Sequence, residues 1–276
     1  MAENRIEAAL ERARQRRKDD KRADSRAAAT EQPPVPRQPM PQFPELAIDG
    51  HGCTARRILI SERGAHGNVG ADASYRMLRT RVLQRMRANR WTTIGVTSPS
   101  QGDGKSLTTL NLALSIAREG NSNVFLLDLD MRNPTLCNSL GVVPPVDMNE
   151  YLAGDGQPED LLFSIGIDNL LLAGSVTSTN RASELLATRG VEKLFSYIRS
   201  IAPQPLVLVD LPPVLATDDA LVVAPMVDAC LLVLAEGRSR RDSAAEAIAV
   251  LSEFQLAGIV LNRSRAAIKD YHYNYS

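Results

Sequence analysis

The pattern of apolar and polar residues along this 276-residue chain changes at about residue 71. Beyond that point, six short runs rich in Val, Ile and Leu predict strands that are buried on both faces. These runs cover residues 91–98, 123–130, 169–174, 205–213, 228–237 and 256–263. Apolar residues three or four positions apart predict helices, with a possible break at Gly190, over residues 73–90, 107–120, 182–201 and 243–254. Strands that alternate with helices indicate an α/β fold, in which a mostly parallel sheet carries helices on both faces.

The start of the chain is charged and rich in helix formers. Residues 1–26 predict a helix with Ile6, Leu10 and Ala13 on one side and a basic cluster elsewhere. Two interpretations stay open for this helix: a solvated segment, or a docking helix for a partner or for a membrane surface. Its apolar side is too thin to hold a membrane alone.

A proline-rich stretch separates this helix from the alternating pattern. Six prolines lie between Pro33 and Pro44, and they predict an extended spacer without a core of its own. We therefore expect four parts along the chain: a charged helix over 1–26, a linker over 27–70, a folded domain over 71–265 and a tail over 266–276.

The composition of the chain limits which binding partners and which cellular compartment we expect. The formal net charge is +0, so nothing suggests a nucleic-acid partner. Three scattered cysteines without metal-ligand spacing are typical of a reducing compartment. The N-terminus has no apolar signal-peptide region, and no apolar run approaches the roughly 18–20 residues of a membrane span. These features predict a cytoplasmic protein.

A glycine-rich loop follows the first predicted strand and precedes a helix. In the sequence GDGKS, Gly102 and Gly104 let the backbone turn its N–H groups toward an anion, and the helix adds its positive end. Lys105 is placed to reach phosphates, and Ser106 offers a hydroxyl to Mg²⁺. The first glycine of the usual pattern is replaced by Pro99. The alternative, a helix-capping turn that happens to contain GKS, leaves the acidic strand ends unexplained.

Acidic residues close two of the predicted strands. Asp128 and Asp130 end one strand, on the same side of the chain by strand alternation, and Asp210 ends another. Buried carboxylates without compensating cations are costly, and Mg²⁺ would offset that cost. A single acidic strand end is often structural, but two of them beside GDGKS predict a site for a nucleotide and magnesium.

The last residues, KDYHYNYS, place Tyr271, Tyr273 and Tyr275 at every second position. A frayed terminus is the simple interpretation. Disordered segments are usually poor in aromatic residues, however, which leaves a functional tail as the alternative.

Together these motifs resemble the bacterial tyrosine kinases (BY-kinases) of capsule and exopolysaccharide synthesis, from about residue 71 to the end. TSPSQGDGKS is similar to their Walker A loop, FLLDLDMRNP to Walker A′ and LVLVDLPPVL to Walker B, within a P-loop NTPase fold. SYRMLRT, GSVTSTNRASELL and the tyrosine tail also resemble that family, as does the opening RIEAALERA.

The resemblance implies a role for each matching residue. ATP and Mg²⁺ would be the cofactors, bound by the loop and by the residue near the base: Gly102, Asp103, Gly104, Lys105, Ser106, Leu107 and Asn262. The metal would be held by Ser106, Asp130 and Asp210. The catalytic residues would be Lys105, Asp130 and Asp128, with Asp128 accepting the tyrosine proton. Arg76 and Arg79 would form the subunit contact of a homo-oligomer, and Tyr271, Tyr273 and Tyr275 would be phosphorylated.

Two positions depart from the family pattern. Ala73 stands where the family has a glutamate before the paired arginines, and Asn133 stands where a basic residue is common. The chain also lacks a membrane-spanning activator, so the resemblance implies a membrane-embedded polysaccharide co-polymerase or chain-length activator as partner. That partner would hold the kinase at the inner face of the membrane.

Two other functions share the predicted fold. One is an ATPase switch of the plasmid-partitioning or septum-positioning type, although those proteins usually carry an extra lysine early in the loop and need no tyrosine tail. The other is a nucleotide-binding regulator of a polysaccharide complex that has lost kinase chemistry, which the missing glutamate at Ala73 motivates.

Overall fold

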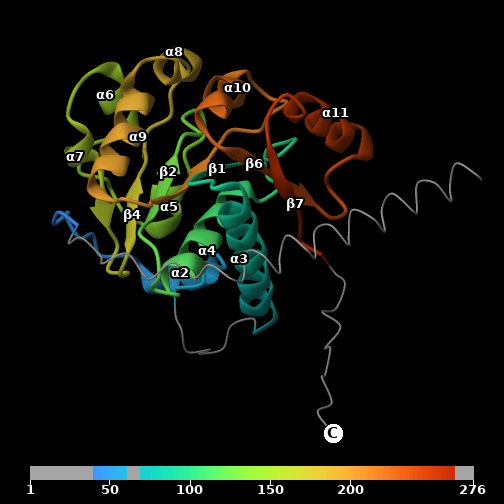
Figure 1. Ribbon diagram of the computed structural model, residues 1–276, viewed down its shortest axis with the longest axis horizontal. Coiled ribbons are helices and arrows are strands. Elements are labelled where there is room, and N and C mark those ends of the chain that lie inside the picture. The colour runs from blue at the N-terminus through green and yellow to red at the C-terminus, as the bar shows by residue number, and fades with distance from the viewer. Residues whose placement is uncertain (1–39, 61–68, 265–276) are drawn as a thin grey trace, which may run out of the picture. The chain divides into compact units, whose positions relative to one another are not determined.

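The computed structural model describes residues 40–60 and 69–264 (Figure 1). The described residues contain a seven-stranded sheet in the order β3-β4-β2-β5-β1-β6-β7. Neighbouring strands are parallel, except for the antiparallel pair β3 and β4. The strands are β1 Thr93–Thr97, β2 Val124–Asp128, β3 Phe163–Ser164, β4 Leu170–Ala173, β5 Leu206–Asp210, β6 Ala229–Ala235 and β7 Leu256–Asn262.

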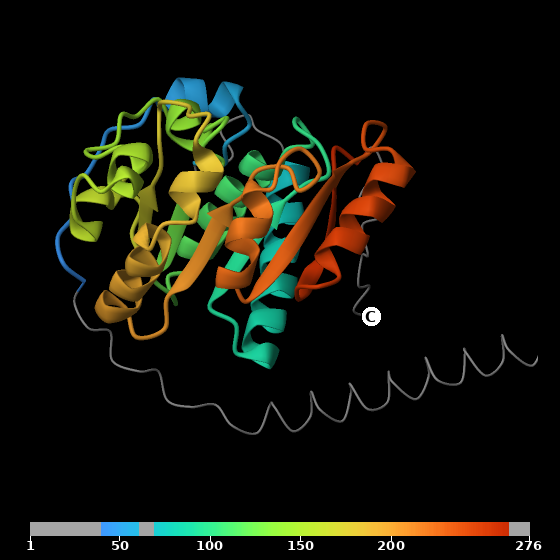
Figure 2. The ribbon, with the colours of Figure 1, turned by 90° about the horizontal axis from the view of Figure 1, so that it is seen from above.

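Helices cover both faces of this sheet (Figures 1 and 2). They are α2 Gly50–Ala55, α3 Val69–Asn89, α4 Lys105–Ala117, α5 Leu136–Leu140, α6 Met148–Ala153, α7 Pro158–Leu161, α8 Ala182–Leu186, α9 Gly190–Ile201, α10 Asp219–Val223 and α11 Arg241–Leu251, with a 3₁₀ turn over Ala224–Met226. Successive residues of β2 point to opposite faces: Leu126 packs with α3 and α4, whereas Phe125 and Leu127 pack with α6 to α9. Because both faces of the sheet are covered by helices, successive residues of a central strand are all buried. This explains why the strands appear in the sequence as continuous apolar runs.

The strands and long helices expected from the apolar pattern are present. All six expected runs contain a strand, and the expected helix that Gly190 was to interrupt is divided into α8 and α9. The two-residue strand β3 and the short helices α2, α5, α6, α7 and α10 were not expected. A helix of one or two turns shows too little of the helical period to be recognised in a sequence, whereas a short buried strand is visible as a continuous apolar run.

The linker expected over 27–70 needs correction for residues 40–60. This segment pairs with the sheet edge, where Leu46 N–H donates to the Ser164 carbonyl at 2.9 Å and Ser164 N–H donates to the Pro44 carbonyl at 2.8 Å. It then forms α2, in which Cys53 is fully buried, and Ile58 is also buried in the core. Isolated apolar residues that follow the last of these prolines have thus joined the core, and the compact unit begins at Met40.

Several predictions lie outside the described residues. They are the charged helix over 1–26, the rest of the proline-rich stretch up to residue 39, and Tyr271, Tyr273 and Tyr275. Within the described parts, no helix is both long and apolar enough to cross a membrane.

Candidate nucleotide and metal site

The predicted site residues meet at the carboxyl ends of three adjacent strands. Strand β5 lies between β2 and β1 in the sheet, and Asp128 at the end of β2 is in register with Asp210 at the end of β5. The glycine-rich loop, residues 98–104, leaves the end of β1 beside them. Ligands of parallel sheets bind beyond this edge, so the topology places the three motifs where a ligand can contact them all.

Both glycines of the loop are required, because a side chain at either position would clash with a different neighbouring residue. Gly102 and Gly104 both have left-handed backbone conformations, with φ of 82° and 93°. A Cβ atom on Gly104 would lie 2.1 Å from the Nδ2 atom of Asn262, and one on Gly102 would lie 2.6 Å from an Arg238 nitrogen. Gly104 also ends the loop directly before α4, whose first N–H groups have no partner within the helix.

Lys105, the first residue of α4, is buried among acidic side chains. Its Nζ atom lies 2.6 Å from Asp130 Oδ2 and 3.5 Å from Asp210 Oδ2, and it lies 3.2 Å from the Ser106 hydroxyl. Burial alone lowers the pKa of Lys105, but the charges of Asp210 and Asp130 outweigh it and raise the pKa above its usual value. The lysine is therefore positively charged and close to both acidic strand ends.

Asp128 is held differently from Asp130. One of its carboxylate oxygens accepts hydrogen bonds from the N–H groups of Thr135 and Leu136, both at 3.0 Å, and the other accepts from Asp130 N–H at 3.1 Å. Burial, with the nearby charge of Asp210, raises the pKa of Asp128 to about 7. Asp128 can therefore change its protonation state near neutral pH, which a proton acceptor must do.

Asp210 is completely buried at the end of β5. Burial raises its pKa above the usual value, although Lys105 and Ser106 act in the opposite direction. The Thr109 hydroxyl of α4 lies 3.5 Å from the second carboxylate oxygen. Among the residues that the structure describes, Asp128, Asp130 and Asp210 thus surround the one ammonium group of Lys105, which leaves net negative charge that a bound cation would neutralise.

These residues fit a magnesium ion that is bound together with phosphates. No group of three or more His, Cys, Asp or Glu side chains within residues 40–60 and 69–264 could hold a metal by itself. Magnesium in phosphate-binding sites takes one or two protein carboxylates and completes its shell with phosphate oxygens and water. Ser106, Asp130 and Asp210 can supply such a partial set.

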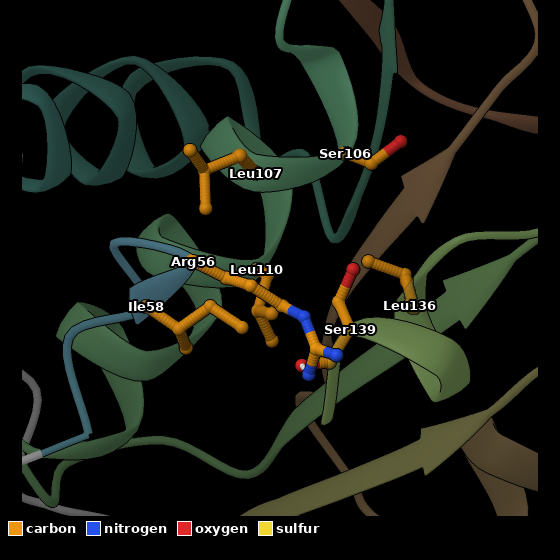
Figure 3. Close-up of a pocket in the computed structure, with 7 residues that line it drawn as sticks. All are labelled: Arg56, Ile58, Ser106, Leu107, Leu110, Leu136 and Ser139. Carbon is orange, nitrogen blue, oxygen red and sulfur yellow. Dashed lines mark hydrogen bonds between the residues drawn. The ribbon is translucent and has the colours of Figure 1, made fainter. Parts of the chain in front are cut away.

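A cavity of about 140 Å³ lies beside Ser106, between α4, α5 and the 40–60 segment (Figure 3). Arg56 crosses this cavity and donates a hydrogen bond from Nη1 to the Ser139 carbonyl at 3.0 Å. Leu107, expected to bind the cofactor, lines this cavity and packs on the hydrophobic core. Its side chain is therefore partly buried against the core, and its backbone N–H in the first turn of α4 is the group left for a phosphate.

Asp103 and Asn262 both support the loop. The Asn262 amide donates from Nδ2 to the Asp103 carbonyl at 3.1 Å, and its Oδ1 accepts from Arg263 N–H at 2.8 Å. The Asp103 side chain is fully buried and accepts a hydrogen bond from Ser100 N–H at 3.2 Å. Asn262 thus lies against the phosphate loop.

The two arginines expected at a subunit contact have different environments. Arg76 is exposed on α3 and pairs with Asp72, one turn away, at 2.7 Å. Arg79 instead donates from Nη1 to the Ser115 carbonyl of α4 at 3.0 Å and lies 3.5 Å from Glu119. Arg76 is free to face another molecule, whereas Arg79 connects α3 to α4 within the chain.

One charged cluster near the site was not expected from the sequence. Arg132 forms a two-pronged ion pair with Asp219, which is 1% exposed, and the Ser183 and Thr217 hydroxyls donate to the same carboxylate. Despite its burial, these contacts lower the pKa of Asp219 below its usual value. The cluster joins the loop after β2 to α8 and to the start of α10. The sequence indicated this cluster only through the arginine in FLLDLDMRNP. The partner of that arginine lies 87 residues away, so no local pattern connects the two.

The fold and this site define a class of protein. A mostly parallel sheet with a glycine-rich loop between β1 and α4, and acidic residues after the neighbouring strands, is a P-loop nucleotide-binding fold. The cell division ATPase MinD of Pyrococcus furiosus shares this fold, with a TM-score of 0.54 and 24% identity. That match covers 63% of this chain and 73% of the MinD chain.

Comparisons with known proteins narrow this class to a family. No family model matches the chain. Tyrosine-protein kinase YwqD of Bacillus subtilis is 28% identical over 203 residues, which cover 73% of this chain and 84% of that protein. Tyrosine-protein kinase CpsD of Streptococcus pneumoniae serotype 4 is 27% identical over 207 residues, which cover 73% of this chain and 88% of that protein.

A solved structure agrees with these sequences. The BceF tyrosine kinase domain is 27% identical, covers 80% of this chain and 93% of its own, and has a TM-score of 0.63. The chain belongs to the bacterial tyrosine kinases, the BY-kinase family, and its enzyme class is protein-tyrosine kinase.

Proposed function

We propose that this chain uses ATP and Mg²⁺ to phosphorylate the C-terminal tyrosines of neighbouring copies of itself, and that this cycle regulates polysaccharide polymerisation and export. The observation that carries the proposal is the buried cluster at the start of α4. There Lys105 Nζ lies 2.6 Å from Asp130 and 3.5 Å from Asp210, beside the Ser106 hydroxyl. This cluster combines a cation for phosphates with oxygen ligands for magnesium.

Each of these residues has a proposed role in phosphoryl transfer. Lys105 stabilises negative charge on the transferred phosphoryl group, and the N–H groups at the start of α4 hold the phosphates. Ser106, Asp130 and Asp210 would hold the metal ion. When bound, the ion would neutralise negative charge on the phosphates. Asp128, with a pKa of about 7, orients the attacking phenol and accepts its proton.

The tyrosine tail is the proposed substrate. About 13 residues separate Asn262 from Tyr275, and an extended chain of that length reaches on the order of 45 Å. That reach is enough to enter the site of an adjacent subunit. Each phosphate adds about −1.5 to −2 charges, so several on one tail would be repelled by an acidic site and would favour dissociation.

The proposed partner is a membrane-embedded polysaccharide co-polymerase or chain-length activator. The support is family resemblance: the relatives YwqD and CpsD are named tyrosine-protein kinases, and the family resembled by the sequence acts in capsule and exopolysaccharide synthesis. Such a partner would place this chain at the inner face of the membrane.

A mixing experiment tests transfer between copies. A kinase variant with Tyr271, Tyr273 and Tyr275 changed to Phe keeps the site and lacks the acceptors. A Lys105→Met variant keeps the acceptors and lacks the ammonium group. We expect phosphotyrosine on the Lys105→Met chain when the two are mixed with ATP, Mg²⁺ and the membrane partner, and none when Lys105→Met is incubated alone. Phosphate on Lys105→Met alone, or none in the mixture, contradicts the proposal.

The ATPase-switch and kinase-inactive alternatives give different results in the same assay. Steady ATP hydrolysis without phosphotyrosine favours a partitioning or septum-positioning type of switch. ATP binding without hydrolysis or transfer, even with the membrane partner present, favours a nucleotide-binding regulator, the possibility raised by Ala73.

A further inference from the structure

Three consecutive carbonyl groups of the phosphate loop are bound from outside the loop. Arg238 Nη2 donates to the Gln101 carbonyl at 3.1 Å, and Arg263 Nη2 donates to the Gly102 carbonyl at 2.9 Å. Asn262 Nδ2 completes the series at the Asp103 carbonyl, at 3.1 Å. The donors come from the turn after β6 and from the end of β7, so two strands that carry none of the acidic site residues support this loop.

The direction of these carbonyls fixes the direction of the loop N–H groups. In a planar trans peptide, a carbonyl and the N–H of the following residue point in opposite directions. With the carbonyls of residues 101–103 turned toward the three donors, the N–H groups of Gly102, Asp103 and Gly104 point the other way. A row of N–H groups on one side of a loop is the arrangement that binds a phosphate.

Arg238 has a second partner in the loop. The Asp103 carboxylate is fully buried, and within the described parts of the chain its Oδ1 atom accepts no hydrogen bond and lies 3.9 Å from Arg238 Nε. A buried carboxylate requires compensation by charge or hydrogen bonds. Arg238 therefore holds both the backbone and the one acidic side chain of the glycine-rich turn.

Arg263 is held in a conformation that its residue type disfavours. It has a φ of 56°, in the left-handed region, and its N–H donates to the Asn262 side chain. Non-glycine residues remain in this region only where surrounding contacts hold them, and such positions cluster at functional sites. Here the left-handed turn brings the guanidinium of Arg263 to the phosphate loop.

We propose that Arg238 and Arg263 are positioning residues that hold the phosphate loop in its anion-binding shape. The proposal rests on the proposed nucleotide function and adds two residues that do not themselves contact the acidic cluster. Because they act on the loop rather than on transferred groups, their loss weakens ATP binding more than it slows transfer at saturating ATP.

Arg263→Ala in the full chain tests this inference, with Arg90→Ala as matched control. Arg90 is also an exposed arginine with left-handed backbone, at φ 59°, but it precedes β1 at the opposite end of the strand from the loop. We expect the dissociation constant for ATP with Mg²⁺, measured by calorimetry, to rise about 5- to 20-fold in Arg263→Ala. Arg90→Ala should match the wild type, and the transfer rate at saturating ATP should change less than about twofold in both.

Two further variants separate the side chain from backbone strain. Arg263→Gly relieves the left-handed backbone but removes the guanidinium, so it should bind ATP as weakly as Arg263→Ala. Arg263→Lys keeps one charged donor and should recover part of the affinity. Wild-type ATP affinity in Arg263→Ala, or in Arg263→Gly, overturns the inference.

The results that contradict the proposed function differ from those that contradict the inference about the loop. If the wild-type chain binds ATP with the expected dependence on Arg263 but never phosphorylates tyrosine, the kinase proposal fails and the loop inference stands. If the wild type does not bind ATP, both are wrong.

Discussion

At the residue scale, Asp128 and Asp130 show how two identical side chains acquire different properties. Strand alternation placed both on one side of the chain, but it did not separate their roles. In the structure Asp130 pairs with Lys105, whereas Asp128 binds backbone N–H groups at the start of α5. The sequence identified both residues as candidates. It could not assign their partners, because the path of the loop that brings the start of α5 to Asp128 is not visible in the sequence pattern.

Asp128 should make the nucleotide-free protein less stable as pH rises. Its pKa is about 7 in the folded chain and about 4 in an unfolded chain, so between these values the folded state binds more protons. The free energy of unfolding therefore falls between pH 4 and 7, by at most about 4 kcal/mol from this group. Chemical denaturation at pH 5 and pH 8 should show a larger loss for the wild type than for Asp128→Asn.

Asp168→Asn is the control for this effect, since Asp168 is exposed. Its pH dependence should equal that of the wild type. An Asp128→Asn variant that loses as much stability as the wild type between the two pH values would show that Asp128 is ionised at both.

At the element scale, the sequence predicted well where many residues repeat a pattern and poorly where few do. The continuous apolar runs of β1, β2, β5 and β6 allowed little other than buried strands. The 40–60 segment was missed because the prolines that end at Pro44 predicted a linker, while the core residues of the segment are separated from one another. Whether such residues pack depends on a complementary surface, here the sheet edge at β3 and the sides of α4 and α5 that this segment covers, and no local sequence pattern indicates that surface.

Ile58→Ala should destabilise the protein through this segment. Ile58 is 4% exposed in the core, and truncation of a buried isoleucine to alanine costs about 2–5 kcal/mol. The matched control is Ile248→Ala on α11, where the side chain is 37% exposed and the loss should stay below about 1 kcal/mol. Urea denaturation measures both. Equal effects would mean that residues 40–60 do not contribute to the folded core in solution.

At the scale of the whole molecule, the proposed cycle requires the chain to present its tail to another copy. Of the two arginines expected at the subunit contact, Arg76 is exposed and Arg79 is connected to α4. The sequence pattern marks both as surface residues of one helix. Only the packing of α3 on α4 shows which of them has a partner within the chain.

Arg76→Glu should therefore weaken self-association. The substitution reverses a charge on an exposed face without removing a buried contact, so folding should be preserved. Light scattering coupled to size exclusion, with Mg²⁺ and ATP present, should show loss of the larger species. Arg81→Glu is the control, because Arg81 is also exposed on α3. Loss of assembly in both variants, or in neither, would count against a specific role for Arg76.

The central claim is that the site around Lys105 writes phosphate onto the tyrosine tail. Mass spectrometry of the C-terminal peptide, residues 270–276, tests it most directly in cells that express either the wild type or Lys105→Met together with the membrane partner. The account predicts phosphate on Tyr271, Tyr273 or Tyr275 in the wild type and an unmodified peptide in Lys105→Met when no active copy is present. Equal phosphorylation of both peptides, or of neither, would contradict it.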